Sequence, residues 1–225
     1  MKKIRFELDQ VSPFREIPAG KRKELEASAE KVEFKTRELL YDAGSSPDKV
    51  YLLISGGLKA VRKGAGRRTY VAEFVSPGSL IGYADYIAGV QRTEKLVALQ
   101  PSMVLVLPAG RFVEAAESSA SGARALTRLL AKQIKADQDW LEEQAVENLR
   151  TRLIMLIHNL GKEFGQKTKG GTLVNLRVTH QELADHLGAS RESVTVAISN
   201  LRKQKVLKLD VRRIIIPDMR ALLKA

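Results

Sequence analysis

The sequence predicts an α+β protein in which an N-terminal antiparallel β-barrel of the jelly-roll type is followed by a long helix and a C-terminal winged helix-turn-helix. Short apolar stretches lie between residues 31 and 108 and are separated by glycine-containing turns, a pattern typical of antiparallel barrels. Residues 111–147 carry apolar side chains three and four positions apart, as in a long amphipathic helix. Residues 178–207 contain two short helical patterns around a glycine turn.

The predicted barrel is preceded by a short helical stretch at residues 12–30, in which Pro18 stands near the start. Glycine and proline turns divide the following part into short strands. The expected strands are residues 31–34, 38–41, 49–55, 58–63, 68–75, 80–81, 95–98 and 102–108. The Gly64-Ala65-Gly66 segment lacks the third glycine of a dinucleotide-binding loop and leads into a strand, so we interpret it as a hairpin turn.

The long helix is expected to pack on the barrel with one side and on the same helix of a second copy with the other. Its apolar stripe includes Leu126, Leu130, Ile134 and Leu141, and Asp137 interrupts the stripe. A single amphipathic helix in a monomer is the alternative. Residues 149–164 resume a helix that is apolar enough to form the core of a C-terminal domain.

The helix-turn-helix begins at Thr179, where Glu182 three positions later completes a capping box. Gly188 is expected to end the first helix in the left-handed conformation, and Ser190 to cap the second helix. An ordinary pair of core helices is the alternative. The outer face of the second helix favours DNA binding instead, because its side chains can reach base edges or phosphates. These side chains are Arg191, Glu192, Thr195, Ser199 and Lys203.

Two further segments complete the C-terminal domain. Residues 165–171 are polar and rich in glycine and lysine, so we expect a loop there. Residues 206–217 predict two short strands around a turn near Asp210 and Val211, which is the pattern of a wing. Arg212 and Arg213 in this wing could contact the DNA backbone.

The charge is unevenly distributed along the chain. The formal net charge is +12, and residues 150–225 hold 15 Lys and Arg against 6 Asp and Glu, whereas residues 1–149 hold 23 against 20. The positive excess therefore coincides with the helix-turn-helix, as a phosphate-binding surface requires. A basic surface alone would be weak support, because most charged stretches are merely solvated.

The residue types that are missing exclude several classes of function. The chain has no cysteine, and its histidines are His158, His180 and His186. Disulfides, iron–sulfur clusters, and haem or zinc sites in the N-terminal part are therefore not expected. No nucleophile with a partner base and no phosphate-binding loop is present, so we expect neither an enzyme nor a cofactor. The first ten residues are no secretory signal and no apolar run reaches membrane length, which predicts a cytoplasmic protein without a membrane partner.

The order of these elements resembles the cyclic-AMP receptor protein/FNR family of bacterial transcription regulators across essentially the whole chain. The resemblance lies in residues 41–57, in the Pro77–Gly82 segment, in Leu149–Leu153 and in the Ser190–Val194 start of the second helix. It implies a cyclic-nucleotide-binding-like barrel over residues 1–118, a dimerisation helix and hinge over 119–148, and a winged helix-turn-helix over 149–225. It also implies double-stranded DNA, a second copy of the chain and RNA polymerase as partners.

The resemblance implies base contacts for the second helix. Arg191 would pair with a guanine and Glu192 would accept from a cytosine, both of which suit the chemistry of those bases. Val196 stands where the family has a second base-reading arginine, so we expect a half-site related to TGTGA but not identical with it. The remaining expected DNA-contacting residues are Ser190, Ser193, Thr195, Ser199, His180 and Arg212.

The resemblance also places an effector site at residues 82–93, but the residues differ from those of a cyclic-AMP binder. Tyr83 follows Gly82 where the family has a glutamate for the ribose, and Arg92-Thr93 could still hold a phosphate. The family's adenine contacts fall on Asp137 and Gln138. We therefore expect either no ligand or a small anionic or aromatic ligand other than cyclic AMP. Arg92 could also be an ordinary surface arginine.

The sequence thus predicts a sequence-specific transcription regulator that acts as a homodimer on a palindromic site. A cyclic-AMP-dependent regulator of the same family is the first alternative. A non-specific nucleoid-binding protein is the second, and the Arg191-Glu192 pair argues against it because those side chains suit base recognition.

Overall fold

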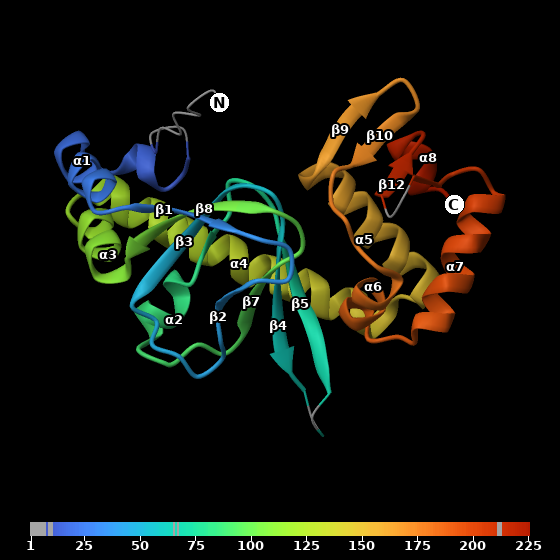
Figure 1. The fold of residues 1–225 in the computed structure, drawn as a ribbon, viewed down its shortest axis with the longest axis horizontal. Coiled ribbons are helices and arrows are strands. Elements are labelled where there is room, and N and C mark those ends of the chain that lie inside the picture. Colours follow the sequence, from blue (N-terminus) through green and yellow to red (C-terminus); the bar gives the residue numbers. More distant parts are fainter. Residues whose placement is uncertain (1–7, 9–10, 65, 67, 211–212) are drawn as a thin grey trace.

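The computed structural model describes residue 8 and residues 11–64, 66, 68–210 and 213–225, and Figure 1 shows their arrangement. A β-sheet domain lies at one end of the molecule and a smaller helical domain at the other, and a long helix passes behind the sheets toward the smaller domain. None of the helices in the described part of the chain is both long enough and apolar enough to cross a membrane.

The N-terminal domain is built from two antiparallel sheets of four strands, in the orders β1-β8-β3-β6 and β2-β7-β4-β5. The strands lie close to the expected residues and confirm the antiparallel β-domain. Their bounds are β1 (Glu30–Phe34), β2 (Leu39–Tyr41), β3 (Lys49–Ser55), β4 (Leu58–Lys63), β5 (Thr69–Val75), β6 (Leu80–Ile81), β7 (Lys95–Ala98) and β8 (Ser102–Pro108).

The core between the sheets follows from the alternation of side chains along each strand. In β3, Tyr51 and Leu53 point into the space between the sheets, whereas Val50 and Leu52 point to the opposite face. All four are buried, because helices cover that opposite face. A strand that is buried on both faces has a continuous apolar sequence rather than an alternating one.

Helices α1 (Ala19–Ala27), α3 (Ala109–Glu117) and the start of α4 (Ala120–Val146) cover the first sheet. The sequence predicted one helical section over residues 111–147, but the chain breaks at Ser118 and Ser119. Ser119 caps α4 by accepting a hydrogen bond from the Gly122 amide at 3.1 Å. A Cβ on Gly122 would lie 2.2 Å from the Ala116 carbonyl oxygen, so a glycine is needed where α3 and α4 meet.

Only the beginning of α4 is buried. Leu126 belongs to the core under the first sheet, whereas Ile134, Leu141 and Val146 are 58, 59 and 75% exposed. The helix ends at Val146, and α5 (Leu149–Glu163) begins after Glu147 and Asn148, both in extended conformation. The connection between the two domains is therefore a two-residue linker.

The C-terminal domain packs α5, α6 (His180–Leu187) and α7 (Arg191–Lys203) against a small sheet of order β11-β12-β10-β9, with α8 (Met219–Leu222) beside them. The wing is confirmed as β11 (Lys208–Asp210) paired with β12 (Arg213–Ile216). The expected polar loop at residues 165–171 is wrong, because it forms β9 (Gly165–Thr168) and the first residue of β10 (Gly171–Val174). The strand β10 pairs with β12, and β9 then pairs with β10. The polar sequence of residues 165–171 did not indicate this pairing.

Candidate functional site

The helix-turn-helix is built by the predicted local signals. The Thr179 amide donates to Glu182 Oε2 at 2.8 Å, and the Glu182 amide donates to Thr179 Oγ1 at 3.2 Å, which completes the capping box of α6. Gly188 follows with a φ of 62°, the left-handed conformation that favours glycine. Ser190 then caps α7 by accepting from the Ser193 amide at 3.0 Å.

Helix α7 has a buried side and an exposed side. Val194, Ile198 and Leu201 are buried in the domain core. The opposite side is exposed and carries most of the side chains expected to contact bases. These are Arg191, Glu192, Thr195, Val196 and Ser199. The Arg191 and Glu192 side chains form no hydrogen bond within the described part of the chain, so their polar atoms are free to meet another molecule.

A hydrogen-bonded chain links the starts of α6 and α7. Thr195 donates its hydroxyl proton to the Arg191 carbonyl at 2.8 Å, so it accepts from His180 Nδ1, which lies 2.9 Å away. Nε2 of neutral His180 then carries no proton and can donate to a phosphate only after protonation. Burial, followed by the charge of Arg191, lowers the pKa of His180. With a neutral ring, His180 donates to Thr195 and positions that side chain. It could contact a phosphate through Nε2 only if a nearby phosphate raised its pKa enough to protonate Nε2.

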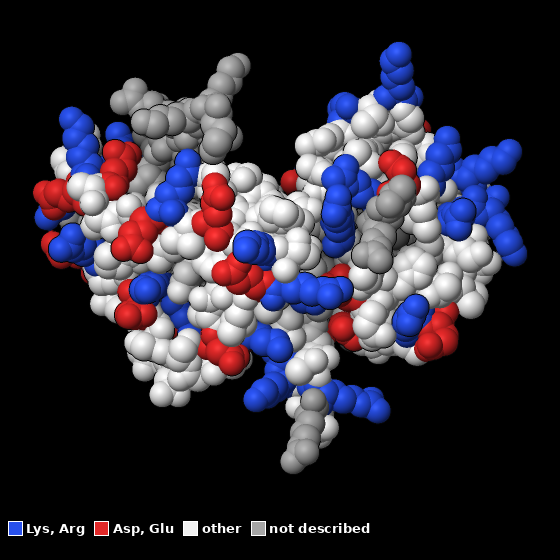
Figure 2. Space-filling model, viewed as in Figure 1, with Lys and Arg blue, Asp and Glu red and all other residues white. Residues whose placement is uncertain are grey.

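The sequence analysis missed a basic groove between the end of α7 and the wing. It has a volume of about 860 Å³, and its cationic lining residues are Arg202, Lys203, Lys205 and Lys208. Figure 2 shows further Lys and Arg side chains over the C-terminal domain. Only Lys203 was noticed in the sequence, although the charge run from Arg202 to Lys208 could have indicated the groove. Of the predicted wing arginines, Arg212 lies outside the described residues.

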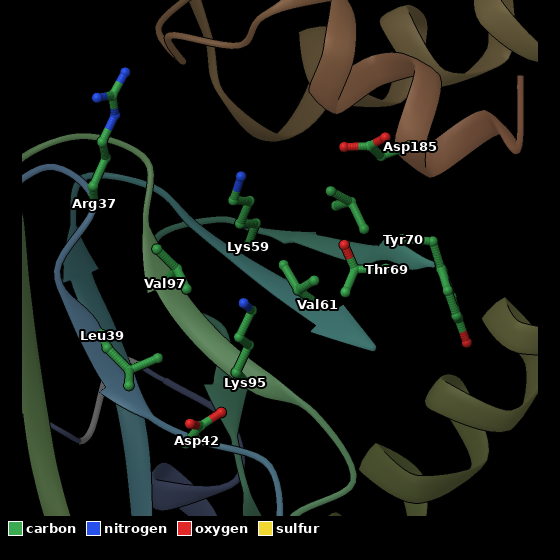
Figure 3. Close-up of a pocket in the computed structure, with 11 residues that line it drawn as sticks. Arg37, Leu39, Asp42, Lys59, Val61, Thr69, Tyr70, Lys95, Val97 and Asp185 are labelled. Carbon is green, nitrogen blue, oxygen red and sulfur yellow. The ribbon is translucent and has the colours of Figure 1, made fainter. Parts of the chain in front are cut away.

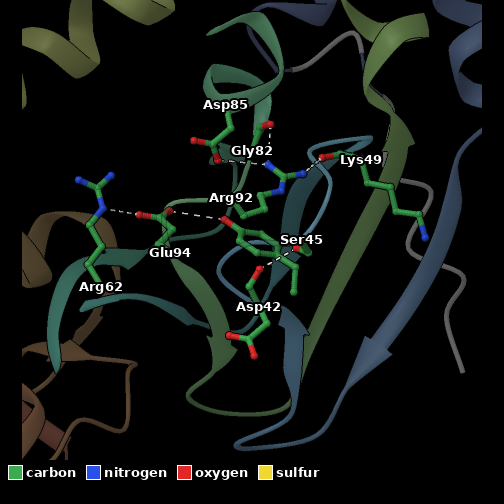
Figure 4. Close-up of polar contacts among 9 residues, drawn as sticks. Asp42, Ser45, Lys49, Arg62, Gly82, Asp85, Arg92 and Glu94 are labelled. Atoms are coloured by element: carbon green, nitrogen blue, oxygen red, sulfur yellow. Dashed lines mark hydrogen bonds and ion pairs between the residues drawn. The ribbon is translucent and has the colours of Figure 1, made fainter. Parts of the chain in front are cut away.

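The expected effector site is closed around Arg92, and the surface-arginine alternative is wrong. Arg92 is 3% exposed. It donates through Nη1 to the Gly82 carbonyl at 2.7 Å and through Nη2 to the Lys49 carbonyl, and Nη1 lies 3.5 Å from Asp85 Oδ2. Its guanidinium stands 4.5 Å from the centre of the Tyr41 ring. Figure 4 shows these groups converging on the guanidinium.

This closure depends on Gly82, whose φ is 85°. A Cβ there would lie 2.3 Å from Arg92 Nη1, so only glycine permits the approach. A second ion pair continues the network, since Arg62 Nε donates to Glu94 Oε2 at 2.9 Å and the Tyr41 hydroxyl lies 3.5 Å from Glu94 Oε1 (Figure 4). The Arg92 guanidinium is thus neutralised and mostly hydrogen-bonded by the chain itself.

The other expected effector residues differ in their exposure and in their polar partners. Tyr83 is buried, and its burial, followed by the carboxylates of Glu73 and Asp137, raises its pKa to about 12. Asp137 accepts from Gln133 Nε2 at 3.1 Å, and Gln138 and Thr93 are exposed. A cyclic nucleotide would meet carboxylates where it needs donors, and it would have to displace Asp85 from Arg92. The residues do not fit cyclic AMP.

The described residues contain no group of three or more His, Asp and Glu side chains arranged to hold a metal ion. The arrangement on the C-terminal domain suits recognition of another molecule, because a helix with exposed polar side chains lies beside a cationic groove.

Two family models match the chain: the Crp-like helix-turn-helix domain over residues 151–225 and the cyclic nucleotide-binding domain over residues 31–119. The anaerobic regulatory protein of Haemophilus influenzae is 25% identical over 187 residues, which cover 83% of this chain and 72% of that protein. The global nitrogen regulator of Synechococcus elongatus is 24% identical, covering 91% of this chain and 90% of its own. The structure of FixK2 from Bradyrhizobium japonicum superimposes with a TM-score of 0.76 at 18% identity, covering 87% of this chain and 96% of that one.

Proposed function

Because the chain belongs to the cyclic-AMP receptor protein/FNR family of DNA-binding transcription regulators, we propose that it acts as a homodimer on a palindromic DNA site and needs no bound ligand. Residues 1–118 serve as the β-domain, 119–148 as the dimerisation helix and hinge, and 149–225 as the DNA-binding domain. RNA polymerase is the partner through which such a regulator would act. The observation that carries the proposal is the exposed face of α7, where Arg191 and Glu192 are free to meet bases.

The state of Arg92 supports independence from a ligand. A ligand shifts a conformational equilibrium only by its differential affinity for the two states. An anion entering the β-domain would replace the Asp85 carboxylate and two carbonyl groups that already engage Arg92. The exchange replaces one set of charged hydrogen bonds with another, so little free energy remains to drive a change of shape.

The exposed residues of α7 also define the expected half-site. Arg191 offers two donors that fit guanine O6 and N7, and Glu192 accepts from the amino group of cytosine. Val196 has no donor and is 60% exposed, so it can only pack against an apolar group such as the methyl of thymine. The half-site should therefore contain one guanine that pairs with Arg191 and one cytosine that pairs with Glu192. The base pair that faces Val196 should tolerate more variation.

Selection of binding sites from random DNA duplexes tests this function. We expect the purified chain, without added ligand, to enrich one sequence repeated with two-fold symmetry. Enrichment that requires a cell extract would contradict ligand independence. Binding that is equally tight to all duplexes would indicate a non-specific nucleoid-binding protein instead.

Cyclic AMP is expected to leave specific DNA affinity nearly unchanged. Tyr83 cannot supply the charged acceptor for a ribose hydroxyl, and hydrogen bonds to charged groups contribute about 1.5–3 kcal/mol. Titration of cyclic AMP to millimolar concentration during operator binding checks this expectation. An affinity gain above about tenfold, or about 1.4 kcal/mol of coupling, would show that Arg92 and Thr93 suffice for binding.

Substitution of Lys208 by alanine is expected to weaken binding to all DNA sequences by a similar factor. Lys208 lines the cationic groove and lies at the start of β11 in the wing, so it should contact a phosphate. Each lost phosphate contact lowers the magnitude of the slope of log affinity against log salt by about 1, so a dimer that loses two contacts should change it by about 2. Lys162→Ala is the matched control, because Lys162 is exposed on α5 outside the groove. An unchanged slope for Lys208→Ala would remove the groove from the DNA surface.

A further inference from the structure

The DNA-binding domain is docked on the outer face of the second sheet by specific polar contacts. Lys59 Nζ on β4 donates to Glu182 Oε1 on α6 at 2.8 Å, with the two side chains only 21 and 16% exposed. His186 Nδ1 on α6 lies 2.9 Å from the Val71 carbonyl oxygen on β5, and its ring stands 5.3 Å from that of Phe74. These contacts all join α6 to the hairpin of β4 and β5.

A second set of contacts lies beside the first. The side chain of Gln100 donates through Nε2 to the Asn175 carbonyl at 3.1 Å and accepts from the Arg177 amide at 3.3 Å. A Cβ on Gly57 would lie 2.4 Å from Leu176 Cδ1, so the loop before α6 approaches the β-domain closely. The loop before α6 and helix α6 itself are thus both in contact with the β-domain.

The apolar core is continuous across the junction. Val61, Val71, Phe74 and Leu99 of the β-domain are buried in the same cluster as the core of the DNA-binding domain. Figure 3 shows the edge of the junction, a groove of about 420 Å³ with Lys59 on the sheet and Asp185 on α6 at its two sides. A junction with a shared core holds two domains in one relative position.

These contacts hold the helix-turn-helix on the sheet in addition to the covalent link, which a hydrogen bond from Arg152 on α5 to Gln144 on α4 also spans. Glu147 and Asn148 form a two-residue linker in extended conformation between α4 and α5. The docked arrangement also leaves the outer face of α7 exposed. Docking is therefore compatible with DNA binding. A docked domain has fewer orientations before binding, so less conformational entropy is lost when it binds DNA.

We propose that the α6 junction is a proton-sensitive latch, which holds the DNA-binding domain on the β-domain and releases it when His186 gains a proton. The consequence for DNA affinity rests on the ligand-independent function proposed above. The latch itself concerns only the position of the domain.

The chemistry of His186 gives the direction of the switch. The Val71 carbonyl can only accept, so Nδ1 of His186 carries a proton in the docked state, and in the neutral ring Nε2 carries none. A second proton would place a charge beside Phe74 and the shared apolar core. Other charged or titratable side chains occur on the elements at this junction. They are Lys59, Arg62 and Lys63 on β4, Tyr70 and Glu73 on β5, and His180, Glu182 and Asp185 on α6. Helices α5 and α7 also pack against α6, and they add Arg150, Arg152, His158, Lys162, Glu163, Arg191, Glu192, Arg202 and Lys203.

None of those side chains offsets the cost of charging His186. Burial lowers the pKa of His186 below its ordinary value, although the bond to the Val71 carbonyl acts in the opposite direction. Glu182 is engaged by Lys59. A histidine whose pKa is lower when docked favours docking above its undocked pKa of about 6.5 and loses that contribution as the pH falls toward the docked value.

Distance measurements between two spin labels test the latch. The chain has no cysteine, so Lys23→Cys on α1 and Lys169→Cys between β9 and β10 introduce unique attachment points on exposed residues. The doubly labelled chain is diluted with unlabelled chain, so that only distances within one chain are measured. We expect a narrow distance distribution at about pH 8 and a broad one at about pH 5.5.

Two histidine variants identify the group that titrates. His186→Gln keeps an N–H donor for the Val71 carbonyl and never becomes charged, so its distribution should stay narrow at both pH values. His158→Gln is the matched control, because His158 on α5 also has a pKa lowered by burial but takes no part in the contacts between α6 and the β-domain. The His158→Gln chain should behave like the unsubstituted chain.

The proposal is overturned if the unsubstituted chain gives the same distribution at both pH values. It is also overturned if His186→Gln broadens on acidification, or is already broad at about pH 8, since ring shape rather than charge would then hold the junction. The measurement needs no DNA, so any of these results leaves the proposed function standing.

Discussion

Substitution of Arg191 by alanine is expected to abolish sequence-specific DNA binding while the fold stays intact. Arg191 is exposed at the first turn of α7, and its guanidinium forms no hydrogen bond within the described residues. A bidentate guanine contact contributes about 1–3 kcal/mol of discrimination, and a dimer would lose two such contacts. Competition binding among half-sites that differ at the guanine position measures the loss.

Arg220→Ala is the control for this experiment. Arg220 is also an exposed arginine of the DNA-binding domain, but it lies on α8, away from the α7 surface. It removes the same charge and should preserve the ranking of half-sites. Thermal unfolding should show an unchanged midpoint for both variants, because neither side chain is part of the core. An Arg191→Ala protein that ranks half-sites as the unsubstituted chain does would remove α7 from the major groove.

The second large effect is expected on α4. Ile134→Glu with Leu141→Glu should convert the homodimer into monomers and strongly reduce affinity for a palindromic site. Both side chains are more than half exposed in the single chain and lie seven positions apart, which is two helical turns. A glutamate pair at a helix–helix contact would bury charges without partners. Sedimentation at micromolar concentration measures the change in mass.

The stripe predicted from the sequence also contained Leu130, but that residue packs partly against the core under the first sheet. Ile134 is therefore the better site for a charge, because it tests association without disturbing the β-domain. Lys132→Gln with Ala136→Glu is the control, since it changes the net charge equally on the opposite side of α4. A monomeric unsubstituted chain would refute the dimer. An Ile134/Leu141 variant that stays dimeric would place the interface elsewhere.

The elements that could be predicted from the sequence are those with local signals. The strand β4 has the expected bounds because glycines precede and follow it, and α6 begins at its capping box. Elements without such signals were missed, and α2 (Tyr83–Ala88) and β9 are two of them. Helix α2 has only six residues between Gly82 and Gly89, and β9 is exposed along its whole length. Their regular structure depends on packing and strand pairing with other parts of the chain, and the spacing of apolar residues within these short segments does not indicate it.

The candidate site divides in the same way. The exposed face of α7 follows from helix geometry once the caps are recognised. The burial of Arg92 does not, because its Nη2 donates to the carbonyl of Lys49, which is 43 positions away in the chain. Nor could the docking of α6 be predicted, since Lys59 and Glu182 are 123 positions apart. The base contacts of the α7 residues remain predictions.

Glu182 constrains how this protein can change in evolution. The same carboxylate accepts from the Thr179 amide at the start of α6 and from Lys59 of the other domain. A lineage that loses Lys59 retains a capped helix, and Glu182 can find water when the junction opens. A lineage that loses Glu182 first uncaps the helix and also leaves Lys59 without its partner. Descendants that reposition the DNA-binding domain should therefore lose the lysine before the glutamate.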